Sequence, residues 1–233
     1  MSKWMFVIMI GFLFGCASSR FVEPLEANKW AVGASTGGPI VDVNSKPIPV
    51  PLSSIEVGYG IDDKTTAYGG VHTTALLFGT AQLDLGVVRQ FAEQDKFVPN
   101  VSGALGTNLA FSPSEKAFRI WPTIDLNMYW NYGERRSYFY VGLNNYFDLS
   151  SELAHGLEQR NRFLLSPQLG HIFKSKYNTF QLTAEVKFIA PYANNEAAFV
   201  DYSSLMGSKG ATGVYIGFRK MIGNKKPLDK LED

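Results

Sequence analysis

The feature that most constrains the fold is a two-residue alternation of apolar with small or polar side chains, repeated in long segments. Ile55, Val57 and Tyr59, for example, alternate with Glu56 and Gly58. Because successive side chains of a β-strand point to opposite faces, this pattern predicts strands with one apolar face and one small or polar face. Ten segments show the alternation, near residues 29–41, 52–62, 64–74, 80–91, 97–112, 117–132, 136–149, 160–174, 177–190 and 211–222.

Composition and charge exclude several other classes of protein. The chain has 233 residues and carries 22 Lys or Arg against 21 Asp or Glu, a formal net charge of +1, whereas proteins that bind nucleic acids usually carry a concentrated basic excess. Aromatic residues make up 14% of the chain, which is unlike a disordered protein. A helical membrane span needs about 20 consecutive apolar residues, and the longest such run, residues 4–16, is shorter. The sequence therefore predicts one all-β domain that does not bind nucleic acid.

Two all-β architectures fit the alternation, a soluble barrel or sandwich with its apolar face inside and a membrane barrel with that face outside. The segments are 11 to 16 residues long, which exceeds the usual strand of about 5–6 residues and suits strands that cross a bilayer at a tilt. Outer-membrane barrels also join their strands by short periplasmic turns and longer external loops. Short connections at residues 62–63, 93–96, 133–135 and 175–176 alternate here with connections at residues 42–51, 75–80, 112–116, 150–159 and 190–210. We therefore predict an antiparallel up-and-down transmembrane β-barrel of about 10 strands.

The aromatic residues on the apolar face form two groups, one at each end of the predicted strands. Along single strands the two groups are 8 to 10 positions apart, a separation that projects to roughly 20–25 Å for strands tilted by about 40°. This matches the two girdles where a membrane barrel meets water. The periplasmic group is Trp30, Trp130, Tyr132, Phe139, Phe173, Phe180 and Phe218, and the external group is Phe118, Phe147, Phe163 and Phe188.

The opposite face of the strands should line the barrel interior, or lumen. Glycines such as Gly58, Gly86 and Gly170 stand there beside tyrosines such as Tyr140, so that rings can cover glycines on neighbouring strands. Seven charged residues share this face: Glu56, Asp84, Arg119, Asp125, Glu185, Lys187 and Arg219. Because an unpaired charge in a narrow interior is costly, we expect these side chains to be paired or hydrated. The pattern favours a lumen filled by side chains, and a narrow polar pore is the alternative.

The amino terminus has the layout of a bacterial secretory signal, with a positive start, an apolar segment and small residues after it. Residues 13–16, Leu-Phe-Gly-Cys, resemble the lipobox of bacterial lipoproteins, in which the cysteine is acylated. The resemblance implies a signal peptide at residues 1–15, lipidation at Cys16 and a linker at residues 16–28 before a barrel at residues 29–222. Residues 223–233 would form a periplasmic tail. A free cysteine in an ordinary signal peptide is the alternative.

Sequence motifs for catalysis are missing. The chain has 3 histidines and 1 cysteine, which leaves little material for a metal cluster, and no hydrolase or phosphate-loop motif occurs. Barrel enzymes that modify lipids use a serine, a histidine and an acid near the outer rim. Here His72, Ser166 and Asp84 qualify by residue type alone, with His155 as a second histidine to test. We predict no enzyme activity, no metal and no cofactor.

The longest connection, residues 190–210, is the best candidate for recognition, because loops on a rigid scaffold commonly bind partners. It carries three aromatic side chains among polar neighbours, Tyr192, Phe199 and Tyr202. The alternative is that these side chains pack over the barrel mouth and close it.

From about residue 30 to residue 222, the chain resembles small bacterial outer-membrane β-barrel proteins in architecture. The resemblance implies a place in the Gram-negative outer membrane, contact with outer-membrane lipid, and an extracellular or periplasmic protein partner. We expect a lipid-anchored barrel with a structural or loop-mediated binding role. The other hypotheses are a narrow channel for small solutes, a lipid-modifying barrel enzyme, and a soluble, lipid-tethered barrel that binds a ligand.

Overall fold

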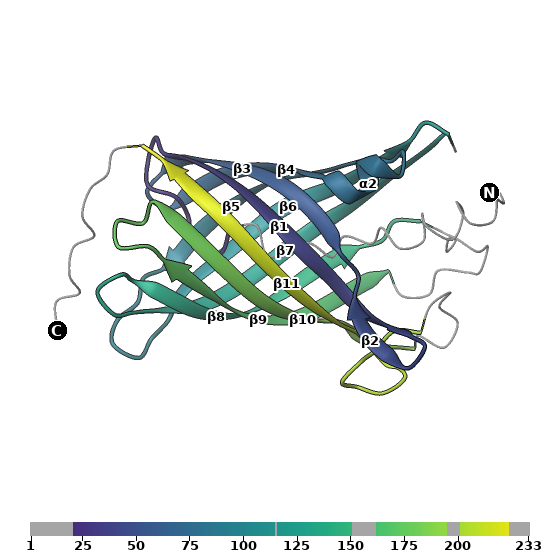
Figure 1. The fold of residues 1–233 in the computed structure, drawn as a ribbon. Coiled ribbons are helices and arrows are strands. Elements are labelled where there is room, and N and C mark those ends of the chain that lie inside the picture. The colour runs from purple at the N-terminus through teal and green to yellow at the C-terminus, as the bar shows by residue number, and fades with distance from the viewer. Residues whose placement is uncertain (1–20, 115, 151–161, 195–200, 224–233) are drawn as a thin grey trace.

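Each of the ten alternating segments contributes a strand to one antiparallel sheet. The structure is a computed structural model that describes residues 21–114, 116–150, 162–194 and 201–223. In the barrel, β1 pairs with β3, and each strand from β3 to β10 pairs with the next one in the chain. The last strand, β11, also pairs with β1, which closes the sheet (Figure 1). The described residues thus form the ten-stranded barrel that the alternation predicted. Its strands are β1 (Trp30–Val43), β3 (Leu52–Asp62), β4 (Thr65–His72), β5 (Ala81–Ala92), β6 (Asn100–Ser112), β7 (Ala117–Tyr132), β8 (Ser137–Phe147), β9 (Phe163–Lys174), β10 (Phe180–Asn194) and β11 (Lys209–Ile222).

The connections fall into two rims at opposite ends of the barrel. Figure 1 shows tight turns between strands at one end, which we call the short-turn rim, and β2 (Lys46–Pro49) and α2 (Thr73–Leu77) at the other, the long-loop rim. The first long connection is a hairpin rather than an irregular loop, because β2 pairs with the end of β1. Its two turn residues, Asn44 and Ser45, have φ values of 54° and 62°, the left-handed conformation that a two-residue hairpin turn requires.

One departure from the predicted strands occurs after β4. The alternation predicted a strand over residues 64–74, but β4 ends at His72 and α2 begins at Thr73. The hydroxyl of Thr74 accepts a hydrogen bond from the Ser53 N–H at 2.7 Å, and this contact bends the chain back over β3. Within the described residues, no helix has the length and apolar character needed to span a membrane.

The apolar face of the sheet points away from the barrel axis, as predicted. Val57 and Leu126 are 40% and 49% exposed, whereas Glu56 and Tyr129, on the other face, are 6% and 1% exposed. A surface of this kind suits contact with hydrocarbon rather than water. Other large apolar side chains exposed on the outer face are Ile55, Leu83, Leu85, Val87, Leu105, Met128, Leu143, Leu169, Leu182 and Ile216.

The two predicted aromatic groups lie at opposite ends of the outer face. Within each group, rings on neighbouring strands contact one another. At the short-turn rim, the rings of Trp130 and Phe139 stack with their centroids 5.1 Å apart. Toward the long-loop rim, Phe147 and Phe163 are paired neighbours with centroids 5.2 Å apart. Such cross-strand aromatic pairs stabilise a sheet.

On the inner face, tyrosine rings cover glycines of the neighbouring strand, as predicted. Tyr140 of β8 is opposite Gly170 of β9, and a Cβ added to Gly170 would lie 2.5 Å from the tyrosine ring. The phenol of Tyr68 covers Gly86 in the same way. These glycines make room for large rings, so the lumen can be filled although the barrel is narrow.

Candidate functional site

The most informative site is the end of the lumen beside the short-turn rim, where residues 21–28 enter the barrel. These residues were expected to belong to the linker at residues 16–28, but Phe21, Val22 and Leu25 are 3%, 0% and 5% exposed. Val22 packs against Tyr129, Tyr138, Tyr140 and Ile172, and the other two side chains pack against Ala31, Val88 and Ala104. We call residues 21–28 the N-terminal plug.

The barrel wall satisfies the backbone of the N-terminal plug. The Leu25 N–H donates to the Thr66 hydroxyl at 2.7 Å, and the Ser102 hydroxyl donates to the Val22 carbonyl at 2.5 Å. Buried backbone groups without partners would be costly. These bonds to β4 and β6 therefore hold the plug in a defined position.

Two inward-facing glycines of β3 let the N-terminal plug approach the wall. A Cβ on Gly58 would lie 2.9 Å from Cε1 of Phe21, and a Cβ on Gly60 would lie 2.9 Å from the carbonyl carbon of Glu26. The Gly60 carbonyl also accepts a hydrogen bond from the Asn28 N–H at 2.8 Å. The wall is therefore shaped to receive this segment.

The apolar signal for the N-terminal plug is present in the sequence but was missed. Val88, Ala104 and Ile172 are apolar residues at inward positions of three different strands, near the same rim. They break the polar pattern of the lumen face. Together with Phe21 and the other apolar residues of the expected linker, they could have indicated an inserted segment.

Arg219 and Glu56, two of the predicted lumen charges, form an ion pair beneath the N-terminal plug. Both Nη2 and Nε of Arg219 bond to Oε1 of Glu56, at 2.7 and 3.0 Å, and the two side chains are each 6% exposed. A third nitrogen, Nη1, donates to Oε1 of Gln181 at 3.3 Å. The guanidinium carbon lies 3.9 Å from the ring centroid of Phe21, so a cation–π contact joins the plug to the charges.

A second pair of predicted charges, Glu185 and Lys187, lies on β10. The ammonium of Lys187 is 3.7 Å from Oε1 of Glu185, and the side chains are 3% and 0% exposed. The Tyr140 hydroxyl donates to Oε2 of Glu185, and the ring of Tyr215 lies under the Lys187 ammonium at 5.7 Å. This cluster fills a section of the lumen with charges that are satisfied by their neighbours.

A third cluster lies toward the long-loop rim, around His72 and Asp84. Nε2 of His72 is 3.0 Å from Oδ2 of Asp84, Asn108 donates to the other Asp84 oxygen, and Gln82 donates to Asn108 at 2.9 Å. Two of the three residues nominated as a triad therefore meet. Ser166 does not join them, since it lies on β9, five strands from β4 in either direction around the barrel, and accepts a hydrogen bond from a backbone N–H of β10 at 3.4 Å. Among the described residues, no group of three metal-ligating side chains occurs.

The remaining two predicted lumen charges, Asp125 and Arg119, lie on β7. Asn144 donates a hydrogen bond to Asp125. Arg119 is half-buried nearer the long-loop rim, and in the described part of the chain it has no carboxylate partner.

The predicted loop aromatics lie in different surroundings. The hydroxyl of Tyr192, at the end of β10, accepts a hydrogen bond from the Leu165 N–H at 3.1 Å and donates to the Phe163 carbonyl. Tyr202 forms a bridge with Val41 of β1. The loop tip beside Tyr202 carries Leu205 and Met206, which are 75% and 57% exposed. Phe199, Cys16 and His155 lie outside the described residues.

The short-turn rim is solvent-facing beyond the plug. There the Lys64 ammonium is 2.7 Å from Oε1 of Glu93, and both side chains are largely exposed. The hydrogen bond from Lys64 lowers the pKa of the Glu93 carboxyl below its ordinary value. An exposed pair of this kind contributes little stability.

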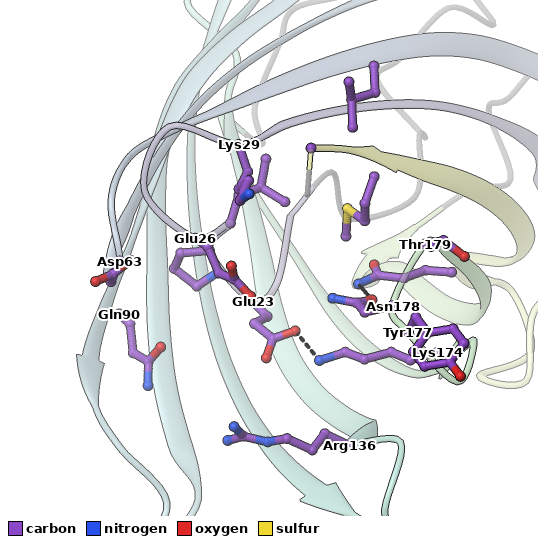
Figure 2. A pocket seen from close by; sticks show the side chains of 16 residues that line it. Glu23, Glu26, Lys29, Asp63, Gln90, Arg136, Lys174, Tyr177, Asn178 and Thr179 are labelled. Atoms are coloured by element: carbon purple, nitrogen blue, oxygen red, sulfur yellow. Dashed lines mark hydrogen bonds and ion pairs between the residues drawn. The ribbon is translucent and has the colours of Figure 1, made fainter. Parts of the chain in front are cut away.

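A cavity of about 240 Å³ lies between the N-terminal plug and the turns of this rim (Figure 2). One wall is the plug itself, and the other walls come from the turns after β3, β7 and β9 and from the end of β11. Glu23 of the plug and Lys174 of β9 form an ion pair of 2.5 Å across it.

Comparison with known proteins gives the fold. No protein-family model and no curated protein matches the chain. Among solved structures, an outer membrane channel from Pseudomonas putida F1 is similar, with a TM-score of 0.51 and 9% sequence identity over 88% of this chain and 100% of that one. The outer membrane protein OprG from Pseudomonas aeruginosa has a TM-score of 0.33 and 12% identity over 88% and 100% of the two chains. The translocator domain of the autotransporter NalP from Neisseria meningitidis has a TM-score of 0.37 and 10% identity over 91% of each chain. At these identities the likeness shows the fold alone, that of bacterial outer-membrane β-barrels.

Proposed function

We propose that this protein is an outer-membrane barrel that stays closed and acts through its external loops, in a structural or binding role. The observation that supports the proposal is a series of buried side-chain clusters along the lumen. The N-terminal plug occupies one end, the Glu185 cluster fills a middle section, and the His72 cluster lies toward the other end. Several of these side chains, including Tyr140 and Gln82, are 1% exposed. A lumen packed in this way leaves the loops as the surfaces able to meet a partner.

The outer face supports insertion in the outer membrane, with the short-turn rim in the periplasm and the long-loop rim outside. The resemblance of residues 13–16 to a lipobox further supports a lipid anchor at Cys16. Metabolic labelling with radioactive palmitate tests the anchor: the wild-type protein should incorporate label and a Cys16→Ser variant should not. Equal labelling of both proteins would place the lipid elsewhere.

A narrow channel is the second candidate function, because the lumen lining is polar and one end is closed by a separate segment. The similar protein from P. putida is described as an outer membrane channel. In this alternative, solutes pass when the N-terminal plug leaves the barrel.

Planar-bilayer recordings separate the two functions. The test compares the wild-type protein with a Phe21→Ser, Val22→Ser, Leu25→Ser variant, which removes the apolar contacts of the plug. A closed barrel should be silent in both forms, because the Glu185 and His72 clusters still fill the lumen. Conduction by the variant alone would favour the plugged channel, and conduction by the wild type would contradict the proposal.

The binding role is tested at the loop tip in a strain that lacks the gene. We expect wild-type protein to restore any envelope defect of that strain, such as sensitivity to detergent or bile salts, and a Leu205→Ser, Met206→Ser variant of equal abundance to restore it less well. Full restoration by the loop variant would argue against recognition through this tip.

A further inference from the structure

The cavity at the short-turn rim has the composition of a binding site for a small ligand. Its volume, about 240 Å³, lies below the roughly 300–1,000 Å³ of sites for drug-sized molecules. Figure 2 shows that charged and amide side chains from the plug, the turns and the strand ends surround it. Because the cavity lies on the solvent side of the plug, a ligand can reach it without crossing the lumen.

The charged side chains of the cavity are balanced in number but only partly paired. Three are acidic, Glu23, Glu26 and Asp63, and three are basic, Lys29, Arg136 and Lys174. Glu23 and Lys174 neutralise each other at 2.5 Å. In the part of the chain that the structure describes, none of the other four takes part in an ion pair within the cavity.

Arg136 is one of two basic side chains in the cavity, with Lys29, that form no ion pair among the described residues. Its Nε is buried and has no acceptor among the described residues. A buried donor without an acceptor is unfavourable, and a guanidinium is shaped to bind a carboxylate through two parallel hydrogen bonds. The guanidinium therefore lines the cavity with hydrogen-bonding capacity that the described residues leave unused.

Glu26 and Asp63 provide the opposite charge at another side of the cavity. Figure 2 shows both side chains at a distance from Arg136. One oxygen of Asp63 accepts a hydrogen bond from the Ala27 N–H at 3.0 Å, which fixes its carboxylate near the plug.

Amide groups complete the lining. Asn178 accepts a hydrogen bond from Gln181 at 3.0 Å, and Gln90 lies on the opposite wall. Side-chain amides donate and accept, so they suit the N–H and C=O groups of a peptide unit. A simple anion would meet the acidic side chains and a simple cation would meet the basic ones, whereas a ligand with both charges is complementary to both regions.

We propose that this cavity binds a short zwitterionic peptide, with its carboxylate on Arg136 and its ammonium group near Glu26 and Asp63. The proposal is independent of whether the lumen conducts or the external loops bind a partner. A ligand held here would contact the N-terminal plug and the turns together, and would stabilise the plugged form over any form in which the plug has left.

Calorimetric titration of the full chain, folded in detergent micelles, tests the charge requirement. The probes are tri-alanine, N-acetyl-tri-alanine and tri-alanine amide, which carry both charges, the negative charge alone and the positive charge alone. We expect saturable binding of tri-alanine, and binding weaker by about tenfold or more for each capped peptide. Absence of tri-alanine binding, or equal binding of all three peptides, would overturn the proposal.

A matched pair of variants tests the position. Arg136→Gln should weaken tri-alanine binding by about tenfold or more and remove the preference for tri-alanine over its amide. Arg135→Gln makes the same change in charge at the adjacent exposed residue, which does not line the cavity, and should leave binding unchanged. Equal effects of the two variants would show that binding depends on the net charge of the rim and not on the position of Arg136. A difference in gel migration between heated and unheated samples confirms that each variant is folded. If a variant does not fold, the capped peptides still test the proposal on the wild-type protein.

Discussion

At the scale of single residues, the lumen shows how a narrow interior accommodates charge. The Arg219 guanidinium uses three nitrogens, two of them on Glu56 and one on Gln181, and one of its faces lies against the ring of Phe21. A lysine could not reproduce this arrangement, since an ammonium is a compact charge without the planar fork and face of a guanidinium. The pair is buried but well satisfied, which is the condition under which a buried ion pair is tolerated.

Removal of one member of this pair should therefore be costly. An Arg219→Met variant leaves the Glu56 carboxylate buried without its partner, and we expect the free energy of unfolding to fall by about 3–5 kcal/mol. Urea titration of the folded barrel in lipid vesicles measures it. Adding Glu56→Gln to the variant should restore part of this loss. The account would be contradicted if the double variant lost more unfolding free energy than the two single variants lose together.

Gly58 is one of the two β3 glycines on which the position of the N-terminal plug depends. A methyl group there would press on the Phe21 ring, whose Cε1 atom would lie 2.9 Å from the added carbon and whose Cζ atom would lie closer still, and overpacking of this kind costs about 1–3 kcal/mol. We expect Gly58→Ala to lower stability in urea by this amount and a second change, Phe21→Ala, to remove the effect. Gly69→Ala is the control, since its nearest atom is a flexible leucine methyl at 3.3 Å. A similar loss from both alanine variants would show that the ring contact is not the cause.

At the scale of elements, the strands could be predicted far better than the segments between them. The alternation arises because successive side chains of a strand point to opposite faces, so it can be read from each strand alone. It extends over nearly all of β5, β7 and β10. The hairpin of β1 and β2 and the start of α2 depend instead on hydrogen bonds such as Ser53 to Thr74, which have no period in the sequence.

The site was harder to predict because its contacts join residues far apart in the chain. The alternation places Glu56 and Arg219 on the same face, but their pairing depends on barrel closure, which brings β3 and β11 to either side of β1. The N-terminal plug was missed because a short segment with three apolar residues shows no regular spacing. Its partners, Val88 and Ile172, are visible only after the strands have been placed around the lumen.

The N-terminal plug should behave as one element. In the Phe21→Ser, Val22→Ser, Leu25→Ser variant, each replaced side chain loses about 1.5–3 kcal/mol of stabilisation from apolar burial. The summed loss exceeds the stabilisation that the few remaining backbone hydrogen bonds of the plug provide. Hydrogen exchange by mass spectrometry should then show rapid exchange of the amides of Leu25, Ala27 and Asn28, which are hydrogen-bonded in the wild type. Strand amides should keep their protection, because the sheet closes without the plug. Unchanged exchange in residues 25–28 would mean that polar contacts alone hold the segment.

At the scale of the whole molecule, the barrel reverses the arrangement of a soluble protein. Polar and charged groups such as Glu185 and Gln82 are 2% and 1% exposed inside, while Leu85 and Ile216 are 51% and 59% exposed outside. In water this outer surface would associate with other copies, since monomeric proteins rarely expose such large apolar areas. In a bilayer the same surface is solvated by acyl chains, and the aromatic rings at both ends lie where the membrane meets water.

Lipid contact makes a depth-dependent prediction along β3, where Val57 and Ile61 share the outer face. Val57 lies in the middle of the strand and Ile61 near the short-turn rim, and they are 40% and 53% exposed. Arginine at Val57 should cost about 2–4 kcal/mol of folding free energy in vesicles, whereas arginine at Ile61 should cost about 0–1 kcal/mol, because a guanidinium near the interface reaches water. Denaturant titration of both variants in the same vesicles measures the difference. Equal costs would mean that the outer face meets water along its whole length, since a surface arginine on a soluble barrel has no depth to sense.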